Sequence, residues 1–370
     1  MKSKVYFTDF RIRREENLIE KFDRLYDKAG LGKIDMKDKF VAIKMHFGEM
    51  GNLAYLRHNY AAGLVAYIKR HGGKPFLTDC NTLYTGSRTN ALDHLETAFV
   101  HGFSFPTTGA QVIIADGLKG DDEALIPVQG ARYCQTALIG RALADADIII
   151  SLTHFKGHES AGFGGALKNL GMGGGSRAGK KDMHSSCKPQ MVAGKCIACH
   201  KCDKACAHGA PDFSTGKCVI DYTKCVGCGR CVEACPTGAI IAGTDENFKV
   251  LDCKIAEYTK AVINGKPNFH IAFVMDISPF CDCYPNNDAP IVPDVGVFAS
   301  SDPVAIDVAC ADAVNRMPAN PDSLLSERCS KDHDHDHFMA LHHGTDWHAQ
   351  VNHGQEIGLG STDYELITMQ

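Results

Sequence analysis

The chain has 370 residues, a formal net charge of -5, 44% hydrophobic residues and 22% charged residues. This length exceeds what one compact domain usually needs, and the apolar fraction supports a large core rather than a disordered chain. The acidic balance argues against a nucleic-acid partner, because nucleic-acid binding normally calls for a basic face.

The cysteine usage and the absence of targeting signals indicate the compartment. The sequence contains 17 cysteines, its N-terminus has no apolar run of the signal-peptide kind, and no stretch approaches the ~20 apolar residues of a membrane helix. Many thiols in a chain of this kind are typical of a reducing environment. We therefore expect a cytoplasmic protein with no membrane attachment, and the sequence leaves the oligomeric state open.

Strand and helix patterns alternate along the first part of the chain. The apolar runs predict strands at 5–8, 41–47, 75–79, 111–116 and 146–152, and the spacing of apolar residues predicts helices at 15–29, 56–71, 92–101 and 135–145. Residues 117–128 have the composition of a hairpin or loop. Alternation of apolar strands with helices favours an α/β fold with a mixed or mostly parallel sheet covered by helices.

The same pattern resumes near the C-terminus. Strands are predicted at 269–277 and 295–301, a helix at 303–316 with Asp302 as its N-cap, and a last strand in YELITM. The segment between these two parts has a different composition. We predict one α/β domain, formed by residues 1–190 and 245–370, and interrupted by a smaller module at 191–244.

The inserted segment contains the sequence pattern Cys-x-x-Cys-x-x-Cys-x-x-x-Cys twice. This is the spacing of two-cluster bacterial ferredoxins, in which the fourth cysteine of each run binds the other cluster. The prediction is an α+β ferredoxin-like module with two 4Fe-4S clusters. The expected ligands of the first cluster are Cys196, Cys199, Cys202 and Cys235, and those of the second are Cys225, Cys228, Cys231 and Cys206. Ala207 follows Cys206, where this pattern usually has proline.

Polar residues recur where the predicted strands end. Ligand sites in open α/β sheets form beyond the carboxyl ends of the strands, so we expect these residues to line one site. The expected set is His46, Glu49, Asp79, Asn81, His154, Lys156, His158, Glu159, Cys281, Cys283 and Asp302. His154, Lys156, His158 and Glu159 are the candidate catalytic residues, for proton transfer or for holding an anion. The alternatives are a hydrogen-bonded polar loop and, for Asp302, a helix cap.

Three further segments contain residues that could bind ligands. The glycine-rich run 162–181 is typical of an anion-binding loop or of a packing loop, with Lys168, Arg177, Lys180 and Lys181 nearby. Cys281 and Cys283 form a Cys-x-Cys pair that could hold an additional metal ion, remain free or switch to a disulfide. The histidine-rich run 333–353 could gather divalent ions or be a solvated tail.

Several long motifs resemble a known family. They are HFGE-x-GN (46–52), PFLTD-x-NTLY-x-G-x-R (75–88), IADG (114–117), HFKGHE-x-x-GFGGALKN-x-GMG (154–173), SPFCDC (278–283) and PDVGVFASSDPVAID (293–307). Together they resemble the domain-of-unknown-function 362 family, and specifically its members with an inserted ferredoxin. The resemblance implies cluster binding and a surrounding α/β domain, and it implies no reaction.

These observations predict an iron–sulfur protein that relays single electrons to or from a site in the α/β domain. The expected activity is an oxidoreductase reaction on a small molecule, with a redox partner protein as the other candidate for electron exchange. Two alternatives remain open. The protein could be a non-enzymatic electron carrier or electron-transfer subunit, or a maturation factor that delivers a metal or cofactor.

Overall fold

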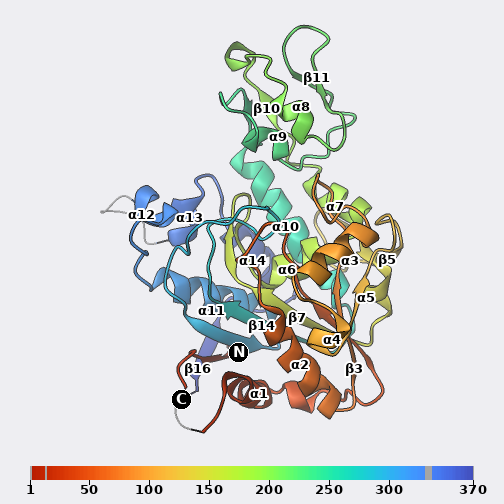
Figure 1. Cartoon of the computed structure of the whole chain (residues 1–370), viewed down its shortest axis with the longest axis vertical. Helices are drawn as coiled ribbons and strands as arrows, with labels where there is room; N and C mark the ends of the chain where they lie inside the picture. The colour runs from red at the N-terminus through yellow and green to blue at the C-terminus, as the bar shows by residue number, and fades with distance from the viewer. Residues whose placement is uncertain (1, 13–14, 330–335, 370) are drawn as a thin grey trace.

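The computed structural model describes residues 2–12, 15–329 and 336–369. Its centre is one eight-stranded sheet, which joins strands from before and after the insert (Figure 1). The strands lie in the order β16 (Tyr364–Thr368), β1 (Ser3–Thr8), β15 (Gly296–Ser300), β14 (Asn268–Val274), β7 (Ile148–His154), β2 (Phe40–Lys44), β3 (Lys74–Asp79) and β4 (Gln111–Ile114).

Only one strand of this sheet runs against the others. β15 pairs antiparallel with β14 and with β1, whereas all other neighbouring strands pair in parallel. The predicted α/β fold with a mostly parallel sheet is therefore confirmed. As a consequence, the carboxyl ends of β14, β7, β2 and β3 meet at one edge of the sheet, and β15 ends at the opposite edge.

Helices cover both faces of the sheet because its central strands are apolar on both sides. On β7, Ile148 and Ile150 pack in the core with α1 (Leu18–Ala29) and α2 (His58–Arg70). Ile149 points to the other face, into a core that includes α6 (Ala166–Gly174) and α10 (Asp245–Val262). A further core on that side holds α11 (Pro303–Asn315). This alternation follows from the two-residue period of a strand.

Shorter elements complete the domain. They are η1 (Leu31–Lys33), α3 (Ala91–Val100), α4 (Phe105–Thr108), α5 (Arg141–Asp145), α7 (Arg177–His184), α12 (Leu324–Arg328), α13 (His337–Leu341), α14 (His348–Glu356), and the strand pairs β5 (Glu123–Pro127) with β6 (Thr136–Gly140) and β8 (Lys156–His158) with β9 (Gly162–Gly164). In the described part of the chain, no helix combines the length and apolar character that crossing a membrane requires.

One predicted helix is wrong. Residues 135–145 form β6 followed by the short helix α5, and β6 pairs antiparallel with β5. Ala137 and Ile139 pack into the core while Thr136 is exposed, so the segment has the two-residue period of a strand. The apolar residues of TALIG fit both periods over so short a stretch, and pairing with β5 decides between them.

The inserted segment forms its own small lobe, which is green in Figure 1. It contains β10 (Gln190–Met191), η2 (Ala193–Lys195), α8 (Lys201–Ala205), β11 (Pro211–Asp212), β12 (Val219–Ile220), α9 (Arg230–Glu233) and β13 (Ile240–Ile241). β10 pairs antiparallel with β13, so the chain enters and leaves the lobe side by side. From there α10 runs into the α/β domain (Figure 1).

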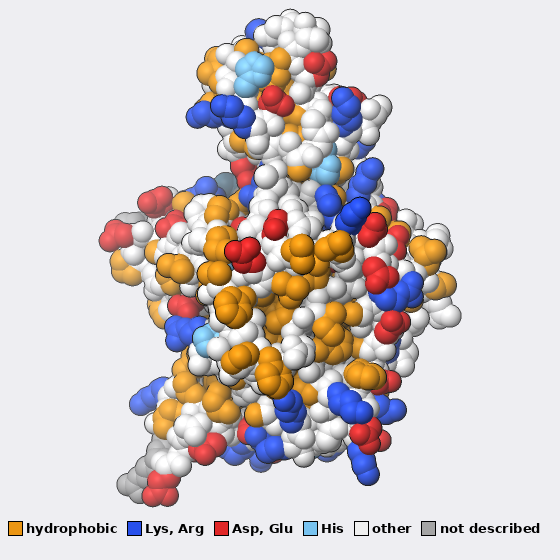
Figure 2. Space-filling model, turned by 45° about the vertical axis from the view of Figure 1, so that its right-hand side comes forward, with side chains coloured by type: hydrophobic (Ala, Val, Ile, Leu, Met, Phe, Trp, Pro, Cys, Tyr) orange, Lys and Arg blue, Asp and Glu red, His pale blue; other side chains and the backbone are white. Residues whose placement is uncertain are grey.

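Figure 2 shows charges of both signs mixed over the face on which α3 lies, with apolar side chains gathered in the middle. The exposed apolar residues of α3 include Leu92, Leu95 and Phe99, which follow the spacing of one helical face. No extended basic surface is visible in this view, in line with the acidic balance of the chain.

The structure separates Asp302 from the other expected site residues. Because β15 is antiparallel, Ser300 lies beside His270, near the start of β14 and at the edge opposite the predicted site. The Asp302 side chain accepts hydrogen bonds from the backbone N–H groups of Val304 and Ala305, at 2.9 Å each. Asp302 is therefore the N-cap of α11, and its expected place in the site is wrong.

We expect Asp302→Ala to lower the free energy of unfolding by about 1–2 kcal/mol, because it removes the cap of a buried helix. Asp302→Ser keeps a capping oxygen and should lose less. Urea unfolding followed by circular dichroism measures both variants. Equal stability of wild type and Asp302→Ala would contradict the capping role.

Candidate functional site

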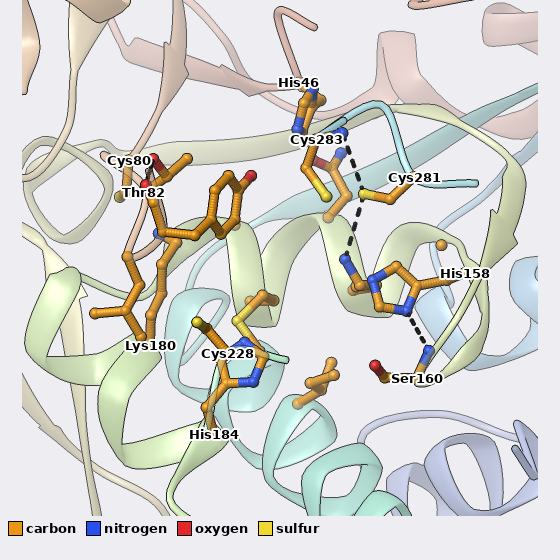
Figure 3. Close-up of a pocket in the computed structure, with 18 of the residues that line it drawn as sticks. His46, Cys80, Thr82, His158, Ser160, Lys180, His184, Cys228, Cys281 and Cys283 are labelled. Carbon is orange, nitrogen blue, oxygen red and sulfur yellow. Dashed lines mark hydrogen bonds between the residues drawn. The ribbon is translucent and has the colours of Figure 1, made fainter. Parts of the chain in front are cut away.

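The carboxyl edge of the sheet opens into a cavity of about 950 Å3, including the part open to solvent. Seven of the eleven expected residues line it: His46, Asp79, Lys156, His158, Glu159, Cys281 and Cys283. Figure 3 shows histidines, cysteines and Lys180 around this space. The other wall comes from α6, α7 and α10 and from the inserted lobe. The loops that follow the strands thus come together at the carboxyl edge of the sheet, as expected.

Cys281 and Cys283 lie in a tight turn rather than in a strand. The backbone N–H of Tyr284 donates to the carbonyl of Cys281 at 3.1 Å, which closes a β-turn over residues 281–284. The N–H of Cys283 donates to the sulfur of Cys281 at 3.4 Å. In Figure 3 the two sulfurs point toward each other. The turn therefore brings both thiols together at the cavity wall.

The surroundings of Cys281 favour its thiolate. A hydrogen bond from the Cys283 side chain is the largest cause that lowers the pKa of Cys281 well below its usual value, although burial opposes it. Lys168 and His158 lower this pKa further. The Lys168 ammonium lies 3.9 Å from the sulfur. Burial and the neighbouring thiolate raise the pKa of Cys283, so the pair consists of one thiolate and one thiol.

The hydrogen bonds of His158 fix its orientation. Its Nδ1 accepts from the backbone N–H groups of Ser160 and Ala161, at 3.1 Å each. The neutral ring therefore carries its proton on Nε2, the nitrogen that lies 3.6 Å from Glu159. His158 is thus positioned to donate a hydrogen bond from Nε2 toward the cavity.

His154 lies behind the cavity wall. Its Nδ1 lies 2.9 Å from Asp282, and its Nε2 lies 2.9 Å from the carbonyl of Met275, so both ring nitrogens are engaged. Lys156 also contacts Asp282, at 3.2 Å, but reaches the cavity. His154 thus occupies the place of a positioning residue rather than that of the catalytic residue we expected.

Asp282 is the buried centre of these contacts. Burial opposes its ionisation, but the charges of His154 and Lys156 outweigh this effect and hold the pKa of Asp282 below its usual value. The carbonyl of Asp282 also accepts the N–H of Glu49 at 2.9 Å. Asp282 therefore fixes the cysteine turn to the loops that follow β7 and β2.

A second network of ion pairs lies at the carboxyl ends of β2 and β3. Lys44 lies 2.9 Å from Asp79, and Arg88 lies 3.1 Å from Glu49 and 3.4 Å from Asp79. Burial opposes the ionisation of Asp79, but Lys44 leads the charges that keep its pKa low. Glu49 is buried under this network and does not line the cavity.

Asn81 also lies behind the wall. Its side-chain amide donates to Asp116 at 2.9 Å and to the carbonyl of Gly117 at 2.8 Å. Burial is the main cause that raises the pKa of Asp116 to about 6. Asn81 thus connects the loops after β3 and β4, which is a structural position.

The glycine-rich run forms β9, α6 and the start of α7. The N–H groups of Ala166 and Leu167 at the start of α6 donate to Asp307, at 2.6 and 2.9 Å. Burial raises the pKa of Asp307 to about 7. These N–H groups are therefore already engaged and do not form the anion-binding loop that we considered. Of its four basic residues, Lys168 and Lys180 line the cavity, and Arg177 and Lys181 do not.

The inserted lobe contributes Cys228 and Arg230 to the same cavity. The Arg230 guanidinium lies between the rings of Tyr84 and Tyr284, 4.4 and 4.0 Å from their centroids, and donates to the carbonyl of Cys283 at 2.9 Å. Sequence reasoning missed Arg230. The sequence did contain one signal for its importance: Arg230 lies between two predicted cluster ligands, Cys228 and Cys231.

Other contacts also hold the lobe against the domain. Tyr284 donates to Glu159 at 2.6 Å and lies in hydrogen-bond contact with Glu233 of α9. At Gly227, where φ is +80°, a Cβ would lie 2.3 Å from the carbonyl of His184. His184 was also missed by sequence reasoning. Burial and the nearby charge of Lys168 lower the pKa of His184 to about 3, so the ring is neutral.

The two predicted ligand sets each line a separate small cavity in the lobe. Cys206, Cys225, Cys228 and Cys231 line one, and Cys196, Cys199, Cys202 and Cys235 line the other, together with Cys218. Backbone N–H groups also point at the sulfurs: Ala239 donates to Cys235 at 3.2 Å and Ala210 to Cys206 at 3.5 Å. Hydrogen bonds of this kind support thiolate ligands of clusters. The stretch 196–235 is thus compatible with cluster binding.

The structure gives no support for a further metal ion. Within residues 2–12, 15–329 and 336–369, the cysteines of the insert included, no group of three or more His, Cys, Asp or Glu side chains is arranged to hold a single ion. Cys281 and Cys283 therefore lack a third ligand of this kind.

Four described histidines of the C-terminal run, His337, His342, His348 and His353, contact separate partners. His342 contacts the carbonyl of Pro279 at 2.7 Å, and His353 contacts Glu257 at 2.9 Å. His333 and His335 lie outside the described residues. The described part of the run therefore stabilises the fold and does not gather around an ion.

The fold and site define a class: an α/β protein with a cysteine-rich insert that contacts a cavity at the carboxyl edge of the sheet. The chain belongs to the DUF362 family, whose model, described as a domain of unknown function, matches residues 41–312. The matched range includes the insert, but the match does not identify the insert as a ferredoxin module. No curated protein matches the chain.

Two solved structures share a distant likeness. The lactate racemase apoprotein from Thermoanaerobacterium thermosaccharolyticum has 11% identity and a TM-score of 0.41, and the match covers 86% of this chain and 59% of that one. A protein from Thermotoga maritima has 12% identity and a TM-score of 0.33, with 69% and 49% covered. The chain thus spans about half of the length of these proteins.

We expect Asp282→Asn to lower the free energy of unfolding by about 3–5 kcal/mol, because it leaves His154 and Lys156 buried without their counter-charge. The low pKa of Asp282 stabilises the fold above the unfolded pKa of about 3.9. The difference between wild type and variant should therefore be full at pH 7 and shrink as the pH falls below about 4.

Urea unfolding at a series of pH values measures this difference. Asp288→Asn is the matched control, because Asp288 lies exposed in the same loop and should change stability by less than about 0.5 kcal/mol. A pH-independent difference between wild type and Asp282→Asn would contradict the assigned role.

Proposed function

We propose that this chain is a cytoplasmic iron–sulfur protein that relays single electrons between two 4Fe-4S clusters in the insert and a redox site in the α/β cavity. One observation carries the proposal. Cys228 and Arg230 line both the cavity of the second predicted ligand set and the large cavity of the α/β domain. A predicted cluster ligand therefore belongs to the wall of the candidate active site.

The residues of the insert fit the clusters. Each set of four cysteines lines one small cavity, and backbone N–H groups donate to the sulfurs of Cys206 and Cys235. A bound cluster supplies a centre that gains or loses one electron at a time. Cys196, Cys199, Cys202 and Cys235 would hold the first, and Cys225, Cys228, Cys231 and Cys206 the second.

The residues of the cavity fit a redox reaction on a small molecule. Cys281 offers a thiolate, with Lys168 3.9 Å away, and His158 offers an Nε2 donor. Glu159 lies beside His158 and can exchange a proton with a bound molecule. Lys156 contacts Asp282 at 3.2 Å and also lines the cavity. It would hold an anionic part of the substrate.

An electron carrier without its own reaction would need the lobe but not this cavity. The enclosed cluster of a thiolate, a fixed histidine and a carboxylate favours an oxidoreductase over a carrier.

Iron analysis of protein purified without oxygen tests the cofactor content. We expect about eight irons and eight inorganic sulfides per chain in wild type, and about four of each in Cys228→Ser, because this variant removes one ligand of one cluster. Cys253→Ser is the matched control, since Cys253 lies on α10 outside both sets.

The relay is tested by reduction with dithionite, followed by visible absorbance and electron paramagnetic resonance. Both clusters should accept an electron. Zinc in place of iron, or clusters that dithionite does not reduce, would contradict the proposed function. Reduced wild type that no small-molecule acceptor reoxidises, but that passes electrons to a protein partner, would favour the carrier instead.

A further inference from the structure

The Cys281–Cys283 pair places two thiols in one turn at the wall of the large cavity. No third ligand joins the two thiols among the described residues. Cys281 is 2% exposed, yet both cysteines line the large cavity, so a bound molecule can reach them. The pair also lies on the side of the cavity nearest to the inserted lobe.

The β-turn over residues 281–284 allows the sulfurs to bond. In an extended strand, residues two apart lie at the upper end of the Cα separation of a disulfide, about 4.4–6.8 Å, and a turn brings them closer. The hydrogen bond from Tyr284 to the carbonyl of Cys281 folds the backbone back, and the Cys283 N–H contacts the Cys281 sulfur at 3.4 Å. The dithiol form shown in Figure 3 therefore has its sulfurs side by side.

The charges around the pair favour its reduced form. Lys168 lies 3.9 Å from the Cys281 sulfur, and His158 is fixed with its Nε2 proton toward the cavity. Both stabilise a thiolate, which exists only when the disulfide is open. A stabilised thiolate makes the corresponding disulfide a better oxidant. Electrons arriving in the cavity would therefore flow into the disulfide.

The lobe touches this pair directly. Arg230, the first residue of α9, donates to the carbonyl of Cys283 at 2.9 Å, and Cys228 lines the same cavity. A disulfide needs two electrons, and two 4Fe-4S clusters carry one each. The electron capacity of the insert therefore matches that of one cysteine pair.

We propose that Cys281 and Cys283 form a redox-active dithiol–disulfide site that stores two electrons between the clusters and the molecule bound in the cavity. This inference rests on the proposed function for its electron donor. In the reducing direction, the S–S bond breaks, one electron comes from each reduced cluster, and one proton is taken up. The products are the Cys281 thiolate and the Cys283 thiol. In the other direction, the pair gives two electrons to a two-electron organic acceptor and the S–S bond forms again.

The first experiment measures the dithiol–disulfide equilibrium of Cys281 and Cys283 and does not depend on enzyme activity. Full-length protein is equilibrated without oxygen in glutathione buffers of graded potential, quenched in acid, alkylated and analysed by peptide mass. The peptide with Cys281 and Cys283 should carry two labels at the reducing end and none at the oxidising end. Cys134, which lies outside the cavity, should stay labelled throughout and serves as an internal standard.

Lys168→Met tests the electrostatic part of the argument. Loss of the cation should shift the equilibrium about tenfold toward the disulfide, which corresponds to about 30 mV for a two-electron couple. Lys181→Met is the matched control, because Lys181 is exposed on α7 and lies away from the cavity. An equal shift in both variants would overturn the role of Lys168.

The second experiment tests the electron source. Disulfide-form protein is mixed with reduced methyl viologen, a one-electron donor, and the labels are counted over time. The disulfide should open in wild type, and this opening should be lost in Cys228→Ser. Unchanged opening in that variant would overturn the coupling to the clusters.

The outcomes separate this inference from the proposed function. Two labels at every glutathione potential, or a disulfide between Cys281 and another cysteine, would overturn the dithiol site even in a protein with about eight irons. The protein could instead contain no iron while Cys281 and Cys283 still change from dithiol to disulfide with the glutathione potential. That result would uphold the dithiol site and reject the clusters as its electron source.

Discussion

The site depends on one buried carboxylate, Asp282. It sits between Cys281 and Cys283, contacts His154 at 2.9 Å and Lys156 at 3.2 Å, and its carbonyl accepts the N–H of Glu49. A charge so deeply buried is stable only with such partners. Because these partners lie on the loops after β7 and β2, one residue aligns three loops of the sheet edge. The position of the two thiols follows from that alignment.

The second constraint is the contact of the lobe with the domain. Arg230 stacks between Tyr84 and Tyr284, and Gly227 allows the lobe backbone to approach His184 closely. A stacked guanidinium is held in a narrow range of positions, unlike a flexible surface ion pair. The lobe therefore has a defined face toward the cavity, and Cys228 lies on it.

The sequence predicted the features that depend on local pattern and spacing. The cysteine runs indicated which thiols gather, and the apolar strands indicated the α/β sheet and its polar edge. It failed where long-range pairing decides the structure. Asp302 was misplaced because a strand pattern does not reveal that β15 runs antiparallel. Residues 135–145 were misassigned because pairing with β5 outweighed a helical pattern. Arg230 and His184 were missed because their roles arise from contacts between distant segments.

The pairing of β10 with β13 has a consequence for how such a chain can change. Because both ends of the insert meet at one narrow neck, its length does not affect the order or spacing of β7 and β14. The host sheet could therefore have existed with a shorter connection, and the cysteine-rich module could be gained or exchanged as a unit. Such an exchange would need only a few matching residues on the docking face, with an arginine at the position of Arg230 foremost among them.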